Sequence, residues 1–182
     1  MKIRTIGLVL TIVLLAVTTV GVFAESGTVV ITGGSLSVTA ADVTLSGVIL
    51  DGTDKTSTSA SGSNSWSASD ARGTGAGWNL TIVATDFSDG THTIDIAAVG
   101  TKFKIQLLDG NITLTSGNTK PTSSVNTLTD IPKVTPLKFV SAATDTGMGS
   151  YTLAPNFELE LPASTYAGSY TSTITISAVT GP

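Results

Sequence analysis

The sequence predicts an all-β protein that folds as an antiparallel β-sandwich, immunoglobulin-like or of a related Greek-key type. Short runs rich in Val, Ile, Leu and Thr recur between clusters of Gly, Asp, Asn and Pro, a pattern typical of strands separated by turns. No window of the mature chain sustains apolar residues at helical spacing. A parallel sheet would need crossover helices, so two packed antiparallel layers are favoured.

Residues 1–24 are predicted to be a secretory signal peptide. Lys2 and Arg4 give a positive start, an apolar run follows, and Val22-Phe23-Ala24 is a small-residue cleavage site. A retained membrane anchor is the alternative, but no basic stop-transfer cluster follows the apolar run. We therefore expect a secreted chain of residues 25–182, long enough for a single domain with its own core and without membrane attachment after cleavage.

The composition limits the partners of that mature chain. The sequence has no cysteine, which removes disulfides and thiolate metal sites, so stability must come from packing. Loss of Lys2 and Arg4 with the leader takes the formal charge from −4 to −6, which disfavours nucleic acid and anionic surfaces. The C-terminus carries no sortase-type signal, so we expect any retention at the cell surface to be non-covalent.

Runs of alternating residues between turn signals define the expected strands. They are 28–32, 35–40, 44–50, 63–70, 78–85, 92–98, 102–108, 111–114, 137–140, 150–161 and 169–178. The pairs Asp51-Gly52, Asp89-Gly90 and Asp109-Gly110 favour tight reversals, because both residue types tolerate positive φ. Of these, Asp109-Gly110 is the clearest predicted hairpin.

Two polar segments are predicted to be loops within the domain. Residues 54–64 are almost wholly small and polar, which also suits an interdomain linker, but too few residues precede them for an independent core. Residues 116–136 contain Pro121, Pro132 and Pro136. Because proline lacks an N–H, we expect this segment to cross an end or edge of the sandwich.

The most informative segment runs from Asp70 to Leu80, with the sequence Asp-Ala-Arg-Gly-Thr-Gly-Ala-Gly-Trp-Asn-Leu. Its glycines suit a tight turn, and an alternating run begins at Trp78. On a strand, residues two apart share a face, so Trp78, Leu80 and Ile82 point the same way.

This segment resembles the first motif of the WxL-domain family, surface proteins of Gram-positive and related bacteria. That motif is an acidic residue followed by x-R-G-x-G-x-G-W-x-L, and Asp70–Leu80 contains every element of it. Gly147–Tyr151 and Leu161–Thr175 resemble the closing segment of the family, so the resemblance covers most of the mature chain. Many members carry a second W-x-L in the last strand, where this chain has Ile176-Ser177-Ala178.

Five residues are candidates for contact with a ligand or the wall. Trp78 and Leu80 form either an exposed binding strip or an inward sheet face, and burial tendencies favour the inward face. Asp70 and Arg72 either brace the glycine-rich turn or bind polar groups of a ligand, and bracing is favoured. Trp66 has only small neighbours, which predicts partial exposure and allows sugar stacking.

Three tyrosines near the C-terminus are predicted to be structural. Tyr166 and Tyr170 follow Pro162, and Tyr151 lies at the start of the expected strand 150–161. Tyrosines in such positions resemble those at the corners of β-sandwiches, where the hydroxyl is hydrogen-bonded back to the main chain.

Catalysis and metal binding are poorly served by this sequence. It holds one histidine, His92, and neither a nucleophile elbow nor a zinc-protease helix motif. Asp51 with Asp54 and Asp86 with Asp89 do not follow the calcium-loop pattern, so we expect turn acids rather than metal ligands. We predict no enzyme activity, no cofactor and no metal.

The resemblance implies a secreted, non-catalytic protein that associates non-covalently with the cell wall, through peptidoglycan or another wall glycan and with other surface proteins as further partners. One alternative is a subunit of a surface assembly or filament that pairs through sheet edges, since Ser and Thr are abundant and charges few. Another is a glycan-binding adhesin, favoured if Trp66 and the tyrosines share an exposed concave patch.

Overall fold

The computed structural model describes residues 26–60, 62 and 64–182. The predicted signal peptide, 1–24, lies outside this range. Residues Thr32–Pro182 form one compact unit. The all-β antiparallel prediction is confirmed, and one short 3-10 helix, η1 (Asp109–Asn111), is the exception within the described residues. The described part contains no helix long and apolar enough to cross a bilayer.

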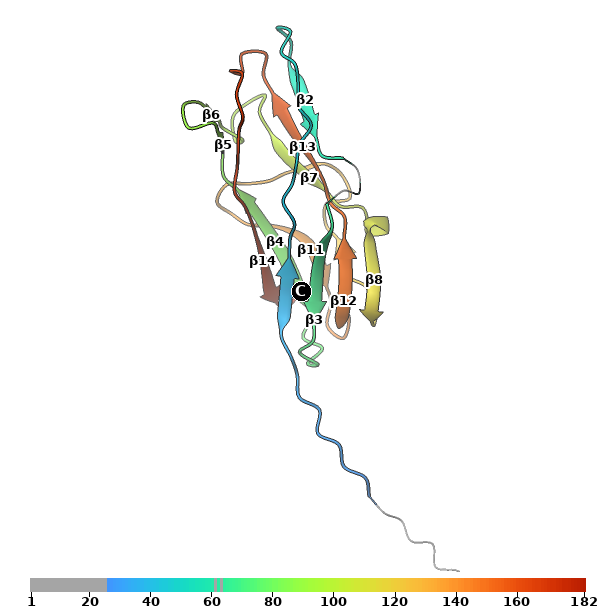
Figure 1. Ribbon diagram of the computed structural model, residues 1–182. Coiled ribbons are helices and arrows are strands. Elements are labelled where there is room, and N and C mark those ends of the chain that lie inside the picture. Colours follow the sequence, from blue (N-terminus) through green and yellow to red (C-terminus); the bar gives the residue numbers. More distant parts are fainter. Residues whose placement is uncertain (1–25, 61, 63) are drawn as a thin grey trace, which may run out of the picture. The chain divides into compact units, whose positions relative to one another are not determined.

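The strands are short and evenly spread along the chain (Figure 1). They are β1 (Leu36–Thr39), β2 (Lys55–Thr58), β3 (Trp66–Asp70), β4 (Trp78–Ala84), β5 (Phe87–Ser88), β6 (Thr93–Ile94), β7 (Phe103–Gln106), β8 (Ile112–Gly117), β9 (Thr122–Ser123), β10 (Thr129–Asp130), β11 (Leu137–Ala142), β12 (Gly149–Leu153), β13 (Asn156–Leu161) and β14 (Ile174–Thr180).

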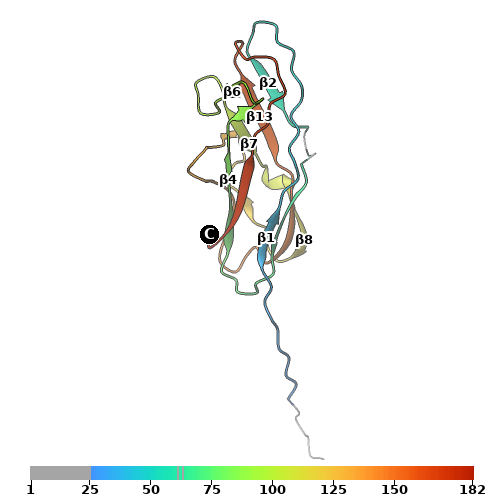
Figure 2. The same ribbon diagram turned by 60° about the vertical axis from the view of Figure 1, so that its left-hand side comes forward.

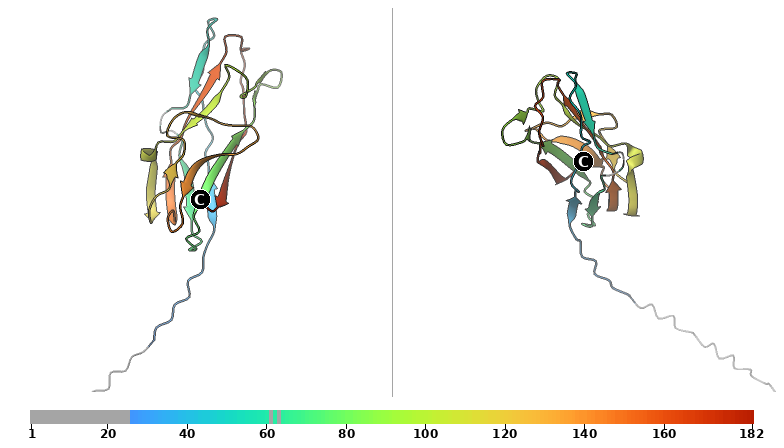
Figure 3. Two further views of the ribbon diagram at one scale, coloured as in Figure 1. Left: turned by 180° about the vertical axis from the view of Figure 1, so that it is seen from behind. Right: turned by 45° about the horizontal axis from the view of Figure 1, so that its top comes forward.

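These strands form three four-stranded sheets and one two-stranded hairpin within the described residues. The sheet orders are β1-β3-β12-β8, β10-β7-β13-β2 and β14-β4-β11-β9, and β5 pairs with β6. In Figure 1 the sheet around β3 lies in front of the sheet around β4, and β12 leads upward into β13. Seen from behind, β14 and β4 lie side by side (Figure 3). The edge strands β1 and β14 are also neighbours, as Figure 2 shows.

Aromatic side chains fill the space between the layers. The ring centroids of Trp66 on β3 and Phe139 on β11 are 6.2 Å apart, and those of Trp78 on β4 and Tyr151 on β12 are 6.1 Å apart. Each pair joins one sheet to the facing sheet, so these contacts define the core of a sandwich.

The predicted hairpin at Asp109-Gly110 is wrong. Residues 109–111 form η1, after which β8 joins β12 while β7 pairs with β13 in another sheet. The Asp109 carboxylate accepts hydrogen bonds from the Ser123 amide at 2.7 Å and from the Asn126 side chain at 3.1 Å. These contacts hold Asp109 against a distant loop, so the pair does not close a two-residue turn.

Other strand predictions need correction. Residues 28–32 form no strand, 44–50 contribute only an isolated bridge from Leu45 to Ser59, and 150–161 is two strands separated at Ala154-Pro155. Proline cannot donate to a ladder, which explains that separation.

The two predicted loops also contain strands. In the segment 54–64, β2 pairs with β13 as the last strand of its sheet. In the segment 116–136, β9 and β10 lie at sheet edges, and Pro121, Pro132 and Pro136 stay outside the strands. The edge position predicted for this second segment is confirmed. Sequence patterns miss such strands because an edge strand has no continuous apolar face.

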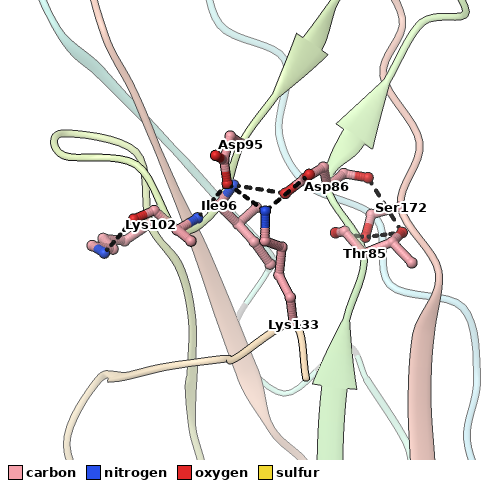
Figure 4. Close-up of polar contacts among 8 residues, drawn as sticks. Thr85, Asp86, Asp95, Ile96, Lys102, Lys133 and Ser172 are labelled. Carbon is pink, nitrogen blue, oxygen red and sulfur yellow. Dashed lines mark hydrogen bonds and ion pairs between the residues drawn. The ribbon is translucent and has the colours of Figure 1, made fainter. Parts of the chain in front are cut away.

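A lysine attaches that proline-rich segment to the β5–β6 region (Figure 4). Lys133 Nζ donates to Asp86 Oδ2 at 3.1 Å and to Asp95 Oδ1 at 2.7 Å, while Asp86 Oδ1 accepts the Ile96 amide at 3.1 Å. The hydrogen bond from Lys133 lowers the pKa of Asp95. Asp86 therefore has protein partners on both oxygens, as a turn acid does.

Candidate functional site

The glycine-rich turn between β3 and β4 packs closely against the loop that precedes β12. Gly75 (φ +64°) accepts the Asp145 amide at 2.8 Å through its main-chain oxygen. A Cβ on Gly77 (φ +70°) would lie 2.6 Å from Ala142 O. Both positions therefore need glycine, for the positive φ and for the close approach.

Asp70 and Arg72 brace this turn, which is the favoured interpretation of the sequence. The guanidinium holds the carboxylate with two hydrogen bonds, Nε to Oδ1 at 2.8 Å and Nη2 to Oδ2 at 2.9 Å. The same Arg72 side chain donates to Gly77 O at 2.9 Å and to the Thr180 hydroxyl at 2.8 Å. It thereby joins the end of β3, the turn and the end of β14.

Burial of both side chains strengthens the attraction between the two charges of this ion pair. The Asp70 side chain is almost fully buried and Arg72 is mostly buried. The hydrogen bond from Arg72 lowers the pKa of Asp70, and the same bond raises the pKa of Arg72. A buried carboxylate with a fixed charged partner keeps its negative charge in the folded state.

Trp78 and Leu80 lie on the inward face of β4. Both side chains are fully buried. The Trp78 Nε1 donates to Gly147 O at 2.8 Å, and a Cβ on Gly147 (φ +71°) would lie 2.8 Å from that nitrogen. Neither Trp78 nor Leu80 presents side-chain surface to a ligand in this structure, so their geometry is that of a scaffold.

Trp66 is not partly exposed, which corrects the sequence prediction. Only 1% of the residue is accessible, and its Nε1 donates to Ala41 O at 3.0 Å. Ser67 and Ser69 lie on the opposite face of β3, whereas Trp66, Ala68 and Asp70 all point inward. The indole packs instead on Phe157, with centroids 5.5 Å apart. The concave patch that would favour an adhesin therefore lacks Trp66.

Two of the three tyrosines are hydrogen-bonded to the main chain through their hydroxyl groups, and the third, Tyr166, is exposed. Tyr151 is buried and its hydroxyl donates to Met148 O at 3.0 Å, and the Tyr170 hydroxyl donates to Tyr166 O at 3.1 Å. Those two tie back to the main chain, as predicted. Tyr166 is 64% exposed, and its ring stacks on His92 with centroids 4.0 Å apart.

A groove that the sequence does not predict opens beside these aromatic residues. It has a volume of about 650 Å³ and lies between residues 45–50 and 165–170, and Phe87, Leu159 and Leu161 also line it. The volume is in the range of ligand-binding clefts. The only sequence signal was the apolar content of 44–50, which we interpreted as a strand.

The single histidine belongs to a turn. Asp89 Oδ1 accepts the main-chain amides of His92 and Thr91, and Asp89 Oδ2 lies 3.2 Å from His92 Nδ1. These main-chain hydrogen bonds, of which the one from His92 has the largest effect, lower the pKa of Asp89 to about 2. Within the described ranges, no group of three or more potential metal ligands occurs.

The strand that would carry a second W-x-L lies directly beside the first. In the register of β14 with β4, Ile176 is opposite Ile82 and Ala178 is opposite Leu80. Small and aliphatic side chains thus occupy the place where a second indole would stand. The arrangement leaves Trp78 as the one tryptophan at this end of the described chain.

Comparison with known proteins identifies a family. The profile described as WxL domain surface cell wall-binding matches residues 27–182. A comparison with curated proteins found no match.

Proposed function

We propose that this chain, which belongs to the WxL domain family of surface cell wall-binding proteins, is a non-catalytic wall protein. We propose further that its ligand is peptidoglycan. The match over residues 27–182 is the observation that carries the proposal. A wall-binding family has its site of action at the cell surface, and secretion through residues 1–24 supplies the route there.

The motif residues support wall binding indirectly. Because Trp78 and Leu80 are buried and Asp70 is bonded to Arg72, we propose that they hold the turn and the loop before β12 in one conformation. A preorganised surface binds with a smaller entropy loss than a mobile one.

The proposed contact surface, here termed the motif-end surface, comprises Arg72, Thr74, Thr144 and Asp145. Thr74, Thr144 and Asp145 are exposed and Arg72 is partly exposed. The Asn118 side chain donates to Asp145 O at 3.0 Å, which adds to the bond between Asp145 and Gly75. Small residues and hydroxyl groups on a fixed backbone suit a neutral glycan, because they allow close approach and hydrogen bonding.

The proposed absence of catalysis is consistent with the surroundings of His92. Its ring interacts with Asp89 and stacks on Tyr166, an arrangement that fixes a turn. A catalytic histidine needs a reacting group within hydrogen-bond reach.

Co-sedimentation with purified sacculi, stripped of secondary polymers, tests the proposal. We expect saturable binding by the secreted protein and at least tenfold weaker binding by Thr74→Glu/Thr144→Glu, because added carboxylates repel the acidic peptide stems. Thr127→Glu, an exposed position away from this surface, is the matched control and should bind normally. The same incubation should release no soluble muropeptides.

Two outcomes would contradict the proposal. Wild-type protein that stays in the supernatant would refute peptidoglycan as the ligand. Equal loss of binding in Thr127→Glu would refute the motif-end surface as the contact.

A further inference from the structure

An exposed aliphatic segment, here termed the arm, precedes the first strand. It comprises residues 28–32, with the sequence Thr-Val-Val-Ile-Thr. Val29 is 79% exposed, Val30 86% and Ile31 87%. β-branched residues are those that strands prefer, yet the arm belongs to no strand of the described chain. Consecutive exposed aliphatic residues of this kind mark a segment that pairs with something else.

The two glycines that follow the arm in the chain are fixed in place. The Gly34 amide donates to Ala71 O at 2.7 Å, and a Cβ on Gly33 would collide with Arg72 O. Gly33 and Gly34 therefore lie beside the turn between β3 and β4, at the motif end of the unit Thr32–Pro182.

The groove described above lies at the other end, near β2 and the tip of β13 at the top of Figure 1. Its lining includes the aliphatic residues Leu45, Val48, Leu50, Leu159 and Leu161. The groove thus offers an apolar interior for aliphatic side chains.

Both walls of the groove also have free main-chain groups. Within the described ranges, neither Gly47–Leu50 nor Ala167–Ser169 makes a main-chain hydrogen bond to another segment. An apolar groove flanked by open backbone is the arrangement that accepts an added β-strand.

We propose that the arm of one copy inserts into the groove of a second copy as an additional strand. Residues two apart share a face of a strand, so Val29 and Ile31 would enter the apolar interior together while Val30 faces outward. The donor segment and the acceptor groove are different surfaces, so the contact is heterologous. Head-to-tail contacts of this type build open filaments.

The arm is too short to fill its own groove. The chain uses Leu36 to Leu45 to pass from the motif end to the groove wall. Val29 and Ile31 lie only five and three residues before the fixed Gly34, so that stretch of chain is too short to cover the distance that the chain spans from Leu36 to Leu45. A second copy is therefore the occupant that the chain geometry favours.

Light scattering of the purified secreted protein over a concentration series tests the inference. We expect the mass of the wild type to rise stepwise with concentration, and the arm variant Val29→Ser/Val30→Ser/Ile31→Ser to stay monomeric. Val99 and Val134 are 100% and 85% exposed outside the arm. The control Val99→Ser/Val134→Ser should assemble like the wild type.

A mixing experiment tests whether the copies assemble head to tail, with the arm of one in the groove of the next. The groove variant Val48→Glu places a charge in the acceptor and should also be monomeric, with a circular dichroism spectrum like the wild type. The arm variant keeps an intact groove and the groove variant keeps an intact arm, so their mixture should form dimers and nothing larger.

A peptide of residues 26–34 gives a measurement that needs no groove variant. We expect it to shift the amide resonances of Val48 and Leu161 in the arm variant, and to bind at least tenfold more tightly than its triple-serine version.

Three results would overturn the inference. They are a wild type that remains monomeric to millimolar concentration, an arm variant that still assembles, or a mixture without dimers. Wall binding is tested separately, because the arm variant retains the motif-end surface. Loss of assembly with normal sedimentation on sacculi, or the reverse, distinguishes the two proposals.

Discussion

The indole nitrogen of Trp78 donates a 2.8 Å hydrogen bond to the main-chain oxygen of Gly147. This bond links the strand that follows the glycine-rich turn with the loop that leads into β12. Both partners are buried, so the bond is made away from water. The tryptophan of the motif is thus a structural tie between two segments far apart in sequence.

Trp78→Phe should distinguish the contribution of this hydrogen bond to stability from that of the packing of the ring. Phe retains an aromatic side chain but leaves the buried Gly147 oxygen without its donor, which costs about 1–3 kcal/mol. Trp78→Ala should cost about 3–5 kcal/mol, because it also creates a cavity. Urea unfolding measures both. Equal stability of the Phe variant and the wild type would show that the hydrogen bond contributes nothing.

Gly147→Ala should be strongly destabilising, by more than about 2 kcal/mol, since an L-residue is strained at φ +71° and its Cβ would lie 2.8 Å from Trp78 Nε1. Gly110→Ala is the control, because a Cβ there meets nothing within 4 Å and φ is not positive. That control should change stability by less than about 0.5 kcal/mol. Similar melting temperatures for the two variants would contradict the argument.

The all-β class and the strand at Trp78 were predictable because they depend on local patterns. Alternation from Trp78 to Ala84 follows the sheet period, and glycines mark the turn before it. The burial of Trp66 was not predictable from its small neighbours. Those neighbours occupy the outer face, and the indole is covered by Phe139 and Phe157 from remote strands.

Long-range pairing explains the remaining errors. The segment 54–64 is predicted to be a loop within the domain, yet main-chain bonds to β13 make Lys55–Thr58 a strand. Asp109-Gly110 looks like a hairpin, yet Ser123 and Asn126 capture the carboxylate. The groove arises from segments that no sequence window brings together, among them 45–50, Phe87 and 165–170. In each case the deciding partner is distant in the sequence.

The Asp70 carboxylate should make stability depend on pH in acid. Arg72 lowers the folded-state pKa of Asp70 below that of the unfolded chain, about 3.9. Its contribution is therefore complete above that unfolded value and is lost as pH falls through the lower folded pKa. Urea unfolding of the wild type and Asp70→Asn should differ most at pH 5–7 and converge as pH falls from about 4.

The exposed Asp42 supplies the control for that series. Asp42→Asn, the same change at an exposed carboxylate, should change stability by less than about 0.5 kcal/mol. A constant difference between the wild type and Asp70→Asn at every pH would mean that the charge of Asp70 does not contribute.

Arg72→Lys tests whether the geometry of the guanidinium matters beyond its charge. Arg72 holds both oxygens of Asp70 and also reaches Gly77 O and the Thr180 hydroxyl. An ammonium cannot reproduce this planar fork, so buried acceptors lose donors and stability should fall by about 1–3 kcal/mol. In a double-mutant cycle with Thr180→Val, the loss from the second change should be smaller in the lysine background. Additive losses would show that Arg72 does not act through β14, and the turn would then be fixed by Asp70 and the close packing of Gly75 and Gly77.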